Sequence, residues 1–320
     1  MSGRATSVIT VATLALLAGC TKPSARDAGA APSPGSAAPA PSAKHAEAPR
    51  APSAPTFTPP PQSAIPGGPF GDAVRQGRAI FTDTPTYARA YVGNVLSCNN
   101  CHLDAGRLPS SAPLWGAWGM YPKYRKKNGH VNTFAERLQG CFRYSMNGTA
   151  PPLGSPELVA LQAYARWMSE GAPVGVKLAG AGYPREDFRP PEPPDYARGE
   201  AVFKAKCALC HGADGQGQQA GGRYVFPPLW GPRSFNWGAG MHELHKAAAF
   251  IKANMPFSRG GTLSDQEAWD VALFMDSHER PQDPRFTGDV AETRAKYHDT
   301  PMSLYGTEVH GHVLGSPSAE

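Results

Sequence analysis

The chain has 320 residues, of which 35 are glycine and 34 are proline, and a formal net charge of +5. So many backbone-breaking residues exclude a long coiled coil or a helical-repeat rod, and a chain of this length is enough for about two domains. The charge comes from 31 Lys and Arg against 26 Asp and Glu, which is no basic stripe, so we expect no nucleic-acid partner.

The N-terminus is typical of an exported protein. Arg4 precedes an apolar run over residues 8–18 that is too short to cross a bilayer and is typical of a secretory signal peptide. The run ends in the letters LAGC, which resemble the bacterial lipobox, so we expect a signal peptide over residues 1–19 and a lipid anchor on Cys20. Thr21, in place of aspartate, favours sorting to the outer membrane of a Gram-negative host. The mature protein is then expected on the periplasmic side of the bacterial membrane.

A segment rich in proline and alanine follows the anchor. Residues 20–68 hold 12 prolines among 49 residues, with Phe57 as the single aromatic side chain. Such a composition buries too little apolar surface to offset the entropy lost on ordering. We therefore expect a disordered tether over residues 20–68 that keeps the folded part away from the membrane.

Two copies of one sequence unit follow the tether. The pattern GRAIF begins at Gly77 and GEAVF at Gly199, and each precedes a CxxCH motif. Further along, PLWG occurs at Pro113 and again at Pro228. An internal repeat of this kind predicts two domains of similar fold.

Each copy of the repeat closes with an apolar-periodic helix behind a serine cap, predicted over residues 155–170 and 264–279. A proline-rich segment separates the copies, so we expect domains over residues 69–189 and 190–285. The remaining residues, 286–320, form a C-terminal extension.

The C-terminal extension is polar and poorly periodic. Tyr297 and Tyr305 are the side chains expected to anchor any part of it that packs against the domains. The sequence indicates no function for this segment.

The CxxCH motifs are the attachment signature of c-type haem. Two cysteines one helical turn apart bond to the haem, and the histidine that follows ligates the iron. A thioredoxin-like redox pair or half of a zinc site would not explain a histidine in both copies. We therefore expect a mostly α-helical protein with two class I cytochrome c-type domains in tandem and two covalently attached haem c groups with iron. The attachment cysteines are Cys98, Cys101, Cys207 and Cys210, and the ligating histidines are His102 and His211.

The second domain offers a methionine as the other axial ligand. Met255 lies 44 residues after His211 and precedes Pro256, which is a common way to present a thioether to iron in class I cytochromes. His242 and His245 are competing ligands. A His/Met haem has a raised reduction potential, which suits an electron relay.

The first domain offers two candidates for the same position. Met146 lies 44 residues after His102, so the repeat favours Met146. Cys141 lies five residues upstream, and it remains unpaired once Cys20 and the four haem cysteines are assigned. An isolated cysteine is often a small buried hydrophobe, but an unpaired thiol in an exported protein calls for a chemical role. The residues alone leave both candidates open.

Cationic residues surround Cys141. Arg137 precedes Cys141 by four residues and Ser145 follows it by four, so the three side chains can share one face of a helix. Nearby cations favour a thiolate and would hold a small dianion. Between residues 107 and 143 there are seven cations against Glu136 alone. They are Arg107, Lys123, Arg125, Lys126, Lys127, Arg137 and Arg143.

These motifs resemble the dihaem thiosulfate dehydrogenase family. The likeness is carried by LSCNNCHLDAGR over residues 96–107, LWG over 114–116, YPKYR over 121–125 and ERLQGCFRYSMNG over 136–148, and it covers residues 70–280. The resemblance implies a two-domain cytochrome, an oxidoreductase that couples two thiosulfates into tetrathionate. Some members of the family also run the reverse reduction.

The resemblance also implies roles at the first haem. The family has an unusual His/Cys ligation there, and the matching cysteine is Cys141, so Met146 becomes a neighbouring core residue. The arginine and serine of the family's substrate pocket fall on Arg137 and Ser145, and a further basic residue falls on Lys127. Electrons would pass through the second haem to an external acceptor such as a small cytochrome c.

One position departs from the family pattern. Many relatives carry a lysine just before the second-haem methionine and are thought to exchange the two ligands, but this chain has Asn254 there. An amide is a poor iron ligand, so we predict His211/Met255 coordination in both redox states.

Two other functions fit the same motifs. In the first, the protein is a non-catalytic dihaem electron carrier, with His102 and Met146 on the first iron and Cys141 as packing. In the second, it is the haem subunit of a multi-protein sulfur-oxidising complex and is inert with free thiosulfate. An assay with thiosulfate and ferricyanide separates these functions from the enzyme.

Overall fold

The computed structural model describes residues 54–184 and 188–316. The expected signal peptide, the lipid-anchor residue Cys20 and most of the tether lie outside the described residues. Among those described, no helix has both the length and the apolarity that crossing a bilayer requires.

The last part of the expected tether is packed on the first domain. The Ala179 N–H donates to the carbonyl of Pro55 at 2.8 Å, and the ring of Phe57 lies 5.9 Å from that of Trp115. The predicted disordered tether therefore extends too far along the chain. Its last residues are packed, because Phe57 gives this end of the segment an apolar anchor.

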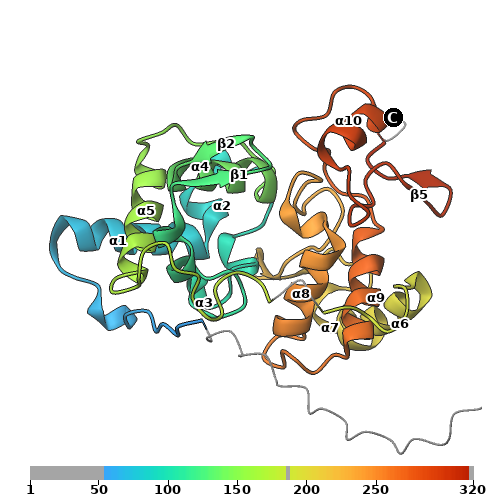
Figure 1. Ribbon diagram of the computed structural model, residues 1–320, viewed down its shortest axis with the longest axis horizontal. Coiled ribbons are helices and arrows are strands. Elements are labelled where there is room, and N and C mark those ends of the chain that lie inside the picture. The colour runs from blue at the N-terminus through green and yellow to red at the C-terminus, as the bar shows by residue number, and fades with distance from the viewer. Residues whose placement is uncertain (1–53, 185–187, 317–320) are drawn as a thin grey trace, which may run out of the picture. The chain divides into compact units, whose positions relative to one another are not determined.

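Two helices packed side by side form the frame of the first domain, α1 (Gly68–Thr82) and α5 (Pro156–Met168) (Figure 1). A Cβ on Gly77 would lie 2.1 Å from the carbonyl oxygen of Ala160, so only glycine lets the two helices approach this closely. Ser155 caps α5 through its hydroxyl, as predicted.

The other elements of the first domain are short and surround this helix pair. Strands β1 and β2 form an antiparallel hairpin in which Tyr124 faces Val131. The bounds are α2 (Thr84–Tyr87), α3 (Leu103–Gly106), β1 (Lys123–Arg125), β2 (His130–Asn132), α4 (Phe134–Gly140) and a π-helical turn (Cys141–Ser145), with 3₁₀ turns at Gln62–Ala64, Arg89–Tyr91, Cys98–Asn100, Leu114–Gly116 and Trp118–Met120.

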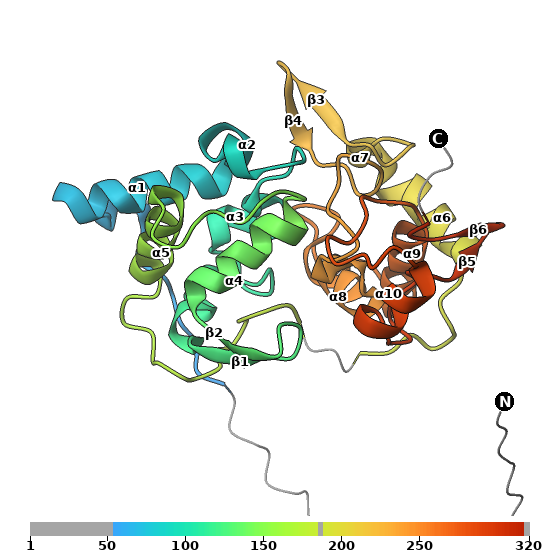
Figure 2. The same ribbon diagram turned by 90° about the horizontal axis from the view of Figure 1, so that it is seen from above.

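The second domain repeats the same packing. Helix α6 (Tyr196–Lys206) packs on α9 (Asp265–Asp276), and α8 (Leu244–Asn254) also lies against α9 (Figure 2). A Cβ on Gly199 would lie 2.1 Å from the carbonyl oxygen of Asp270, as at the equivalent glycine of the first domain. The repeated glycine therefore permits the same close approach of two helices in both domains.

Both predicted closing helices are present, and each ends two to three residues before its predicted end. The cap of α9 is a full capping box, in which Ser264 and Glu267 satisfy each other's backbone N–H groups. The other elements of the second domain are α7 (Ala208–His211), β3 (Gln218–Ala220), β4 (Arg223–Phe226) and a 3₁₀ turn at Gly240–His242.

The C-terminal extension is described as far as residue 316. It contains α10 (Val290–Tyr297) and a small hairpin of β5 (Glu308–Val309) and β6 (His312–Val313). Its core is Tyr305 and Leu314 packed on Trp237, and Tyr305 is fully buried, as expected of an anchor.

Candidate functional site

A cavity of about 480 Å³ lies beside the first CxxCH motif. Cys98, Cys101 and His102 line it on one side, and α4 with the π-helical turn lines it on the other. Most of the remaining lining is apolar, namely Phe81, Leu96, Pro113, Leu114, Phe134, Leu138, Phe142, Leu161, Phe235 and Met241.

A second cavity, of about 230 Å³, lies beside the second CxxCH motif. Cys207, Cys210 and His211 line it together with Met255, the predicted axial ligand. The competing residues His242 and His245 are not among the residues that line it. The geometry therefore favours Met255 over both histidines.

The two histidines of the motifs are held in the form that binds iron. His102 donates from Nδ1 to the carbonyl of Ala112 at 2.7 Å, and His211 donates from Nδ1 to the carbonyl of Pro227 at 2.9 Å. Each Nε2 is thereby left as a free acceptor, which is the ligating atom in such pairs. Burial lowers the pKa of His102 to about 4, so this imidazole is neutral. Paired cysteines, neutral imidazoles and apolar cavities fit covalent haem c in both domains.

One layer of side chains separates the two cavities. Leu96, Cys101, Phe235 and Met241 line both of them. Groups bound in the two cavities would therefore lie close together.

Asn254 lies outside the second cavity. Its Nδ2 donates to the carbonyl of Phe250 at 3.0 Å and to that of Ser110, in the first domain, at 3.1 Å. The amide is therefore occupied by backbone carbonyls, which agrees with the prediction that it is no iron ligand.

Helix α4 and the turn after it present the candidate residues of the first cavity. The helix begins at a capping box, in which Thr133 Oγ1 accepts from the Glu136 N–H at 3.2 Å and a Glu136 carboxylate oxygen accepts from the Thr133 N–H at 2.7 Å. After α4 the chain widens into the π-helical turn, where the Met146 N–H donates to the carbonyl of Cys141 at 3.0 Å. Turns of this kind are rare and often occur at functional sites.

The extra residue in the π-helical turn brings Cys141, Ser145 and Met146 to the cavity together. Met146 is 4% exposed and packs in the core of the first domain, whereas Cys141 is half-buried. Both candidate ligands therefore lie in the wall, and the choice of Cys141 remains a prediction.

Arg137 is the direct polar partner of Cys141. Its Nη1 lies 2.8 Å from Cys141 Sγ, one helical turn away along α4. The charge on a Cys141 thiolate raises the pKa of the buried Arg137 guanidinium, so this arginine stays charged. As their spacing predicts, Arg137, Cys141 and Ser145 all line the same cavity.

The structure does not bring Lys127 to this cavity. Its Nζ donates to the carbonyl of Gly238, in the second domain, and lies 3.8 Å from the centre of the Tyr144 ring. Although much of the residue is exposed, the ammonium itself is desolvated, and this loss of water, with Arg285 nearby, lowers the pKa of Lys127 to about 7.

Among the residues that the structure describes, three other cations line the first cavity besides Arg137: Arg125, Lys177 and Lys246. Lys177 lies beyond α5, and Lys246 lies on α8 of the second domain, where Glu243 pairs with it at 2.6 Å. Sequence reasoning missed both lysines, because no local pattern links them to Cys141 and only the fold brings them there.

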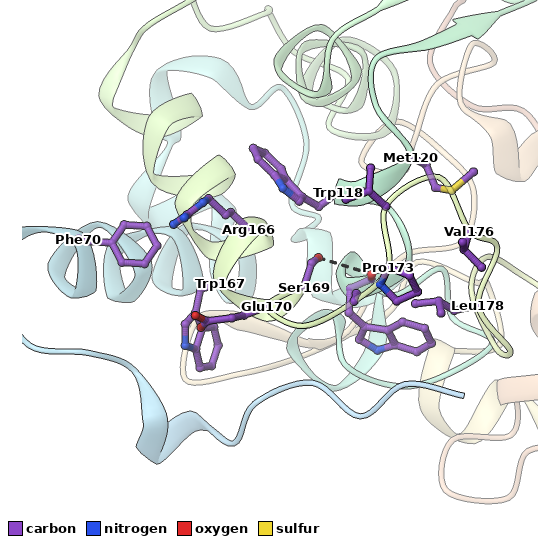
Figure 3. A pocket seen from close by; sticks show the side chains of 15 residues that line it. Phe70, Trp118, Met120, Arg166, Trp167, Ser169, Glu170, Pro173, Val176 and Leu178 are labelled. Atoms are coloured by element: carbon purple, nitrogen blue, oxygen red, sulfur yellow. Dashed lines mark hydrogen bonds between the residues drawn. The ribbon is translucent and has the colours of Figure 1, made fainter. Parts of the chain in front are cut away.

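A further pocket, of about 200 Å³, lies on the first domain and has a different character (Figure 3). Arg166 extends toward the ring of Phe70, 5.1 Å from its centre, and three tryptophans, Trp115, Trp118 and Trp167, form much of the rest. No cysteine or histidine among the described residues lines it, so it is not the candidate site.

Comparisons with known proteins agree with the presence of two CxxCH motifs, each beside a cavity. The family model described as "SoxA/TsdA, cytochrome c domain" matches residues 85–174, and that described as "Cytochrome C oxidase, cbb3-type, subunit III" matches residues 194–275. A thiosulfate dehydrogenase from Thiomonas intermedia is 62% identical over 263 residues, which cover 82% of this chain and 83% of that protein. One from Stutzerimonas stutzeri is 57% identical over 261 residues, which cover 81% and 85%.

A solved structure is similar as well. The thiosulfate dehydrogenase (TsdBA) from Marichromatium purpuratum, in its as-isolated form, has a TM-score of 0.78 and 50% identity. The match covers 81% of this chain and 57% of that one. Two cytochrome c domains with covalently bound haem c, as predicted from the repeat, are thereby confirmed.

Proposed function

The chain belongs to the family of dihaem thiosulfate dehydrogenases, and we propose that it couples two thiosulfates into tetrathionate at the cavity beside Cys141. The observation that carries the proposal is the contact of 2.8 Å between Arg137 Nη1 and Cys141 Sγ in the wall of the first haem cavity. A nucleophilic sulfur beside a fixed positive charge is what a reaction between dianions requires.

Charge neutralisation is the first requirement, because two thiosulfate dianions repel each other. Arg137 is the cation nearest to the sulfur, and its guanidinium can make forked contacts with sulfonate oxygens. Arg125, Lys177 and Lys246 add positive charge around the same cavity. The hydroxyl of Ser145 supplies a donor on the face that carries Cys141.

The proposed reaction has two balanced steps at Cys141. The thiolate and the terminal sulfur of one thiosulfate form a sulfur–sulfur bond and lose two electrons, which gives a Cys-S-S-sulfonate adduct. The terminal sulfur of a second thiosulfate then attacks the sulfur that bears the sulfonate, tetrathionate leaves and the Cys141 thiolate is restored. By microscopic reversibility, the same residues serve tetrathionate reduction.

One layer of side chains separates the two cavities, which supports transfer of the two electrons from the first haem site to the second. When bound, the haem groups supply one-electron redox chemistry and connect the site to an external acceptor such as a small cytochrome c. Cys98, Cys101, His102 and Cys141 would hold one haem. Cys207, Cys210, His211 and Met255 would hold the second. Leu96, Phe235 and Met241 fill the space between the two sites.

Replacing Cys141 tests the covalent scheme. Cys141→Ala and Cys141→Gly should leave both haems attached, because Cys98 and Cys101 form the thioether bonds, but should abolish thiosulfate oxidation. Turnover is followed as ferricyanide reduction with thiosulfate, and haem content by the pyridine haemochrome spectrum. Thiosulfate oxidation retained by either variant would contradict the scheme. A wild-type protein without activity toward free thiosulfate would favour the electron carrier or the subunit of a larger complex.

We also propose that the protein is exported and held by lipid at Cys20, on the periplasmic side of the outer membrane. The support is the signal-like N-terminus with its LAGC sequence and Thr21. Cys20→Ala should end palmitate labelling and move the protein out of the membrane fraction of the host. Labelling that persists in this variant would contradict the lipid anchor.

A further inference from the structure

The π-helical turn that carries Cys141 ends in carbonyl groups that have no partner within the helix. Three of these carbonyls accept hydrogen bonds from outside. The carbonyl of Arg143 accepts from Asn236 Nδ2 at 3.0 Å. That of Tyr144 accepts from the Asn236 N–H at 3.2 Å and also, at 3.4 Å, from the Asn147 N–H just after the turn. The carbonyl of Ser145 accepts from Asn94 Nδ2 at 2.8 Å. Asn236 belongs to the second domain, so the second domain holds the turn of the first.

Asn236 is fully buried and its side chain has no free polar group. Its Nδ2 also donates to Asn147 Oδ1 at 2.9 Å, and its Oδ1 accepts from the Gly238 N–H at 3.0 Å. An aspartate has nearly the same shape but would point an acceptor at the carbonyl of Arg143 and at Asn147 Oδ1. The position therefore requires an amide.

The backbone around Asn236 fits closely against the turn. A Cβ on Gly238 would lie 2.4 Å from Tyr144 Cδ1, so glycine permits the contact. Lys127 donates to the carbonyl of Gly238 from the other side of the Tyr144 ring. We call residues 234–239 the clamp segment.

Residues that follow α9, and Tyr305 of the C-terminal extension, contact the clamp segment as well. The Trp237 N–H donates to the carbonyl of Pro281 at 3.0 Å, and Trp237 Nε1 donates to Glu279 Oε2 at 3.2 Å. The fully buried Trp237 ring packs edge-on against Tyr305, with 5.6 Å between the ring centres. The clamp segment is therefore fixed on both of its sides.

We infer that Asn236 is a positioning residue of the reaction, which acts through the turn that presents Cys141 and Ser145 to the cavity. Asn236 does not line the cavity itself. The inference rests on the proposed function, because it assigns Asn236 to the reaction at Cys141. Displacing reacting groups by about 1 Å can reduce the rate of an enzyme about a hundredfold, so loss of the clamp should be costly.

Two variants and one matched control test the inference in the haem-loaded protein. Asn236→Asp reverses the donor, and Asn236→Ala removes the whole amide. Asn132→Asp is the control, because Asn132 is equally buried and does not itself line the cavity, and its amide contacts His130 Nε2 at 2.6 Å and Asn128 Nδ2 at 2.5 Å. All three changes should lower the melting temperature.

Hydrogen exchange, kinetics and EPR then separate a positioning role from a merely structural one. Both Asn236 variants should exchange amide hydrogens of residues 141–148 at least about tenfold faster and lose about tenfold or more of kcat/KM for thiosulfate. Their first haem should give a heterogeneous low-spin EPR signal with full haem content. Asn132→Asp should match the wild type in all three measurements.

Two results would overturn the inference. The first is exchange over residues 141–148 that Asn236→Asp leaves unchanged. The second is faster exchange with kcat/KM and the EPR signal equal to those of Asn132→Asp, because Asn236 would then contribute to stability alone. If the wild type does not oxidise thiosulfate, the proposed function fails by itself, and exchange together with EPR still decides whether Asn236 positions Cys141.

Discussion

One guanidinium contacts the sulfur of Cys141. Arg137 reaches Sγ with one nitrogen, at 2.8 Å, and has further N–H groups for an incoming sulfonate. A lysine ammonium concentrates its charge on one nitrogen and cannot make the planar, forked contacts of a guanidinium. In the proposed reaction, the same arginine therefore both holds the nucleophile and can receive the substrate.

Replacing each candidate ligand of the first haem separately tests which sulfur binds the iron. In Met146→Leu the oxidised protein should keep a low-spin His/thiolate EPR signal, because Met146 packs in the core and leucine fills a similar volume. In Cys141→Ala that signal should disappear. If the thiolate signal is absent from the wild type and Met146→Leu changes the spectrum, Met146 is the ligand and the electron carrier becomes the better description.

Single residues also show what spacing along the chain can predict. Arg137, Cys141 and Ser145 lie four residues apart, so the period of a helix places them on one face without knowledge of the fold. Lys127 lies in the loop between β1 and β2, off any helix that would relate its place in the chain to that of Cys141, and it contacts Gly238 instead. The cavity cation Lys246 comes from the other domain and has no local signal.

At the scale of elements, the repeated glycines decide how closely the main helices pack. Gly77→Ala places a methyl group against the carbonyl of Ala160 and should lower the free energy of unfolding by about 1–3 kcal/mol. The control is Gly140→Ala, since a Cβ on Gly140 meets no atom within 4 Å and alanine favours the helix by up to about 1 kcal/mol. Guanidinium unfolding of the haem-loaded variants measures both. Equal stabilities of the two variants would contradict the packing role of Gly77.

The elements that could be predicted are those with a local signal. Serine caps and apolar periodicity located α5 and α9 to within a few residues. The π-helical turn at Cys141 could not be predicted in this way, because no side-chain pattern distinguishes it from one more turn of α4. It depends on acceptors and donors from distant segments, above all Asn236.

At the scale of the whole molecule, His298 of the C-terminal extension joins a buried charged cluster in the second domain. His298 and Arg285 contact Asp283 at 3.0 and 2.6 Å, and His298 in turn lies 3.2 Å from His242. Burial alone would raise the pKa of Asp283, but the hydrogen bonds from His298 and Arg285 outweigh it and hold the pKa well below its usual value. No local pattern predicts this cluster, because its members lie up to 56 residues apart along the chain.

Asp283 should therefore make stability depend on pH in the acid range. A depressed carboxylate pKa stabilises the fold above the unfolded-state value near 3.9, and this contribution is lost as the pH falls below it. Asp283→Asn should lower the free energy of unfolding by on the order of 3 kcal/mol at pH 7. This difference in stability from the wild type should shrink below about pH 4. Melting temperatures between pH 7 and pH 3 measure this.

The control for this measurement is an exposed ion pair. Asp265 is 44% exposed and pairs with Lys252 at 2.9 Å, so Asp265→Asn should change stability by less than about 1 kcal/mol. A difference between Asp283→Asn and the wild type that stays constant down to pH 3 would show that the carboxylate charge is not what stabilises the cluster.

The wall shared by the two haem cavities links the surroundings of the two haem sites. Cys101, which belongs to the first CxxCH motif, also lines the second cavity, together with Leu96, Phe235 and Met241. If either domain were produced alone, these side chains would lose one of the two groups that they separate. We therefore expect that a substitution in this wall changes the surroundings of both haems at once.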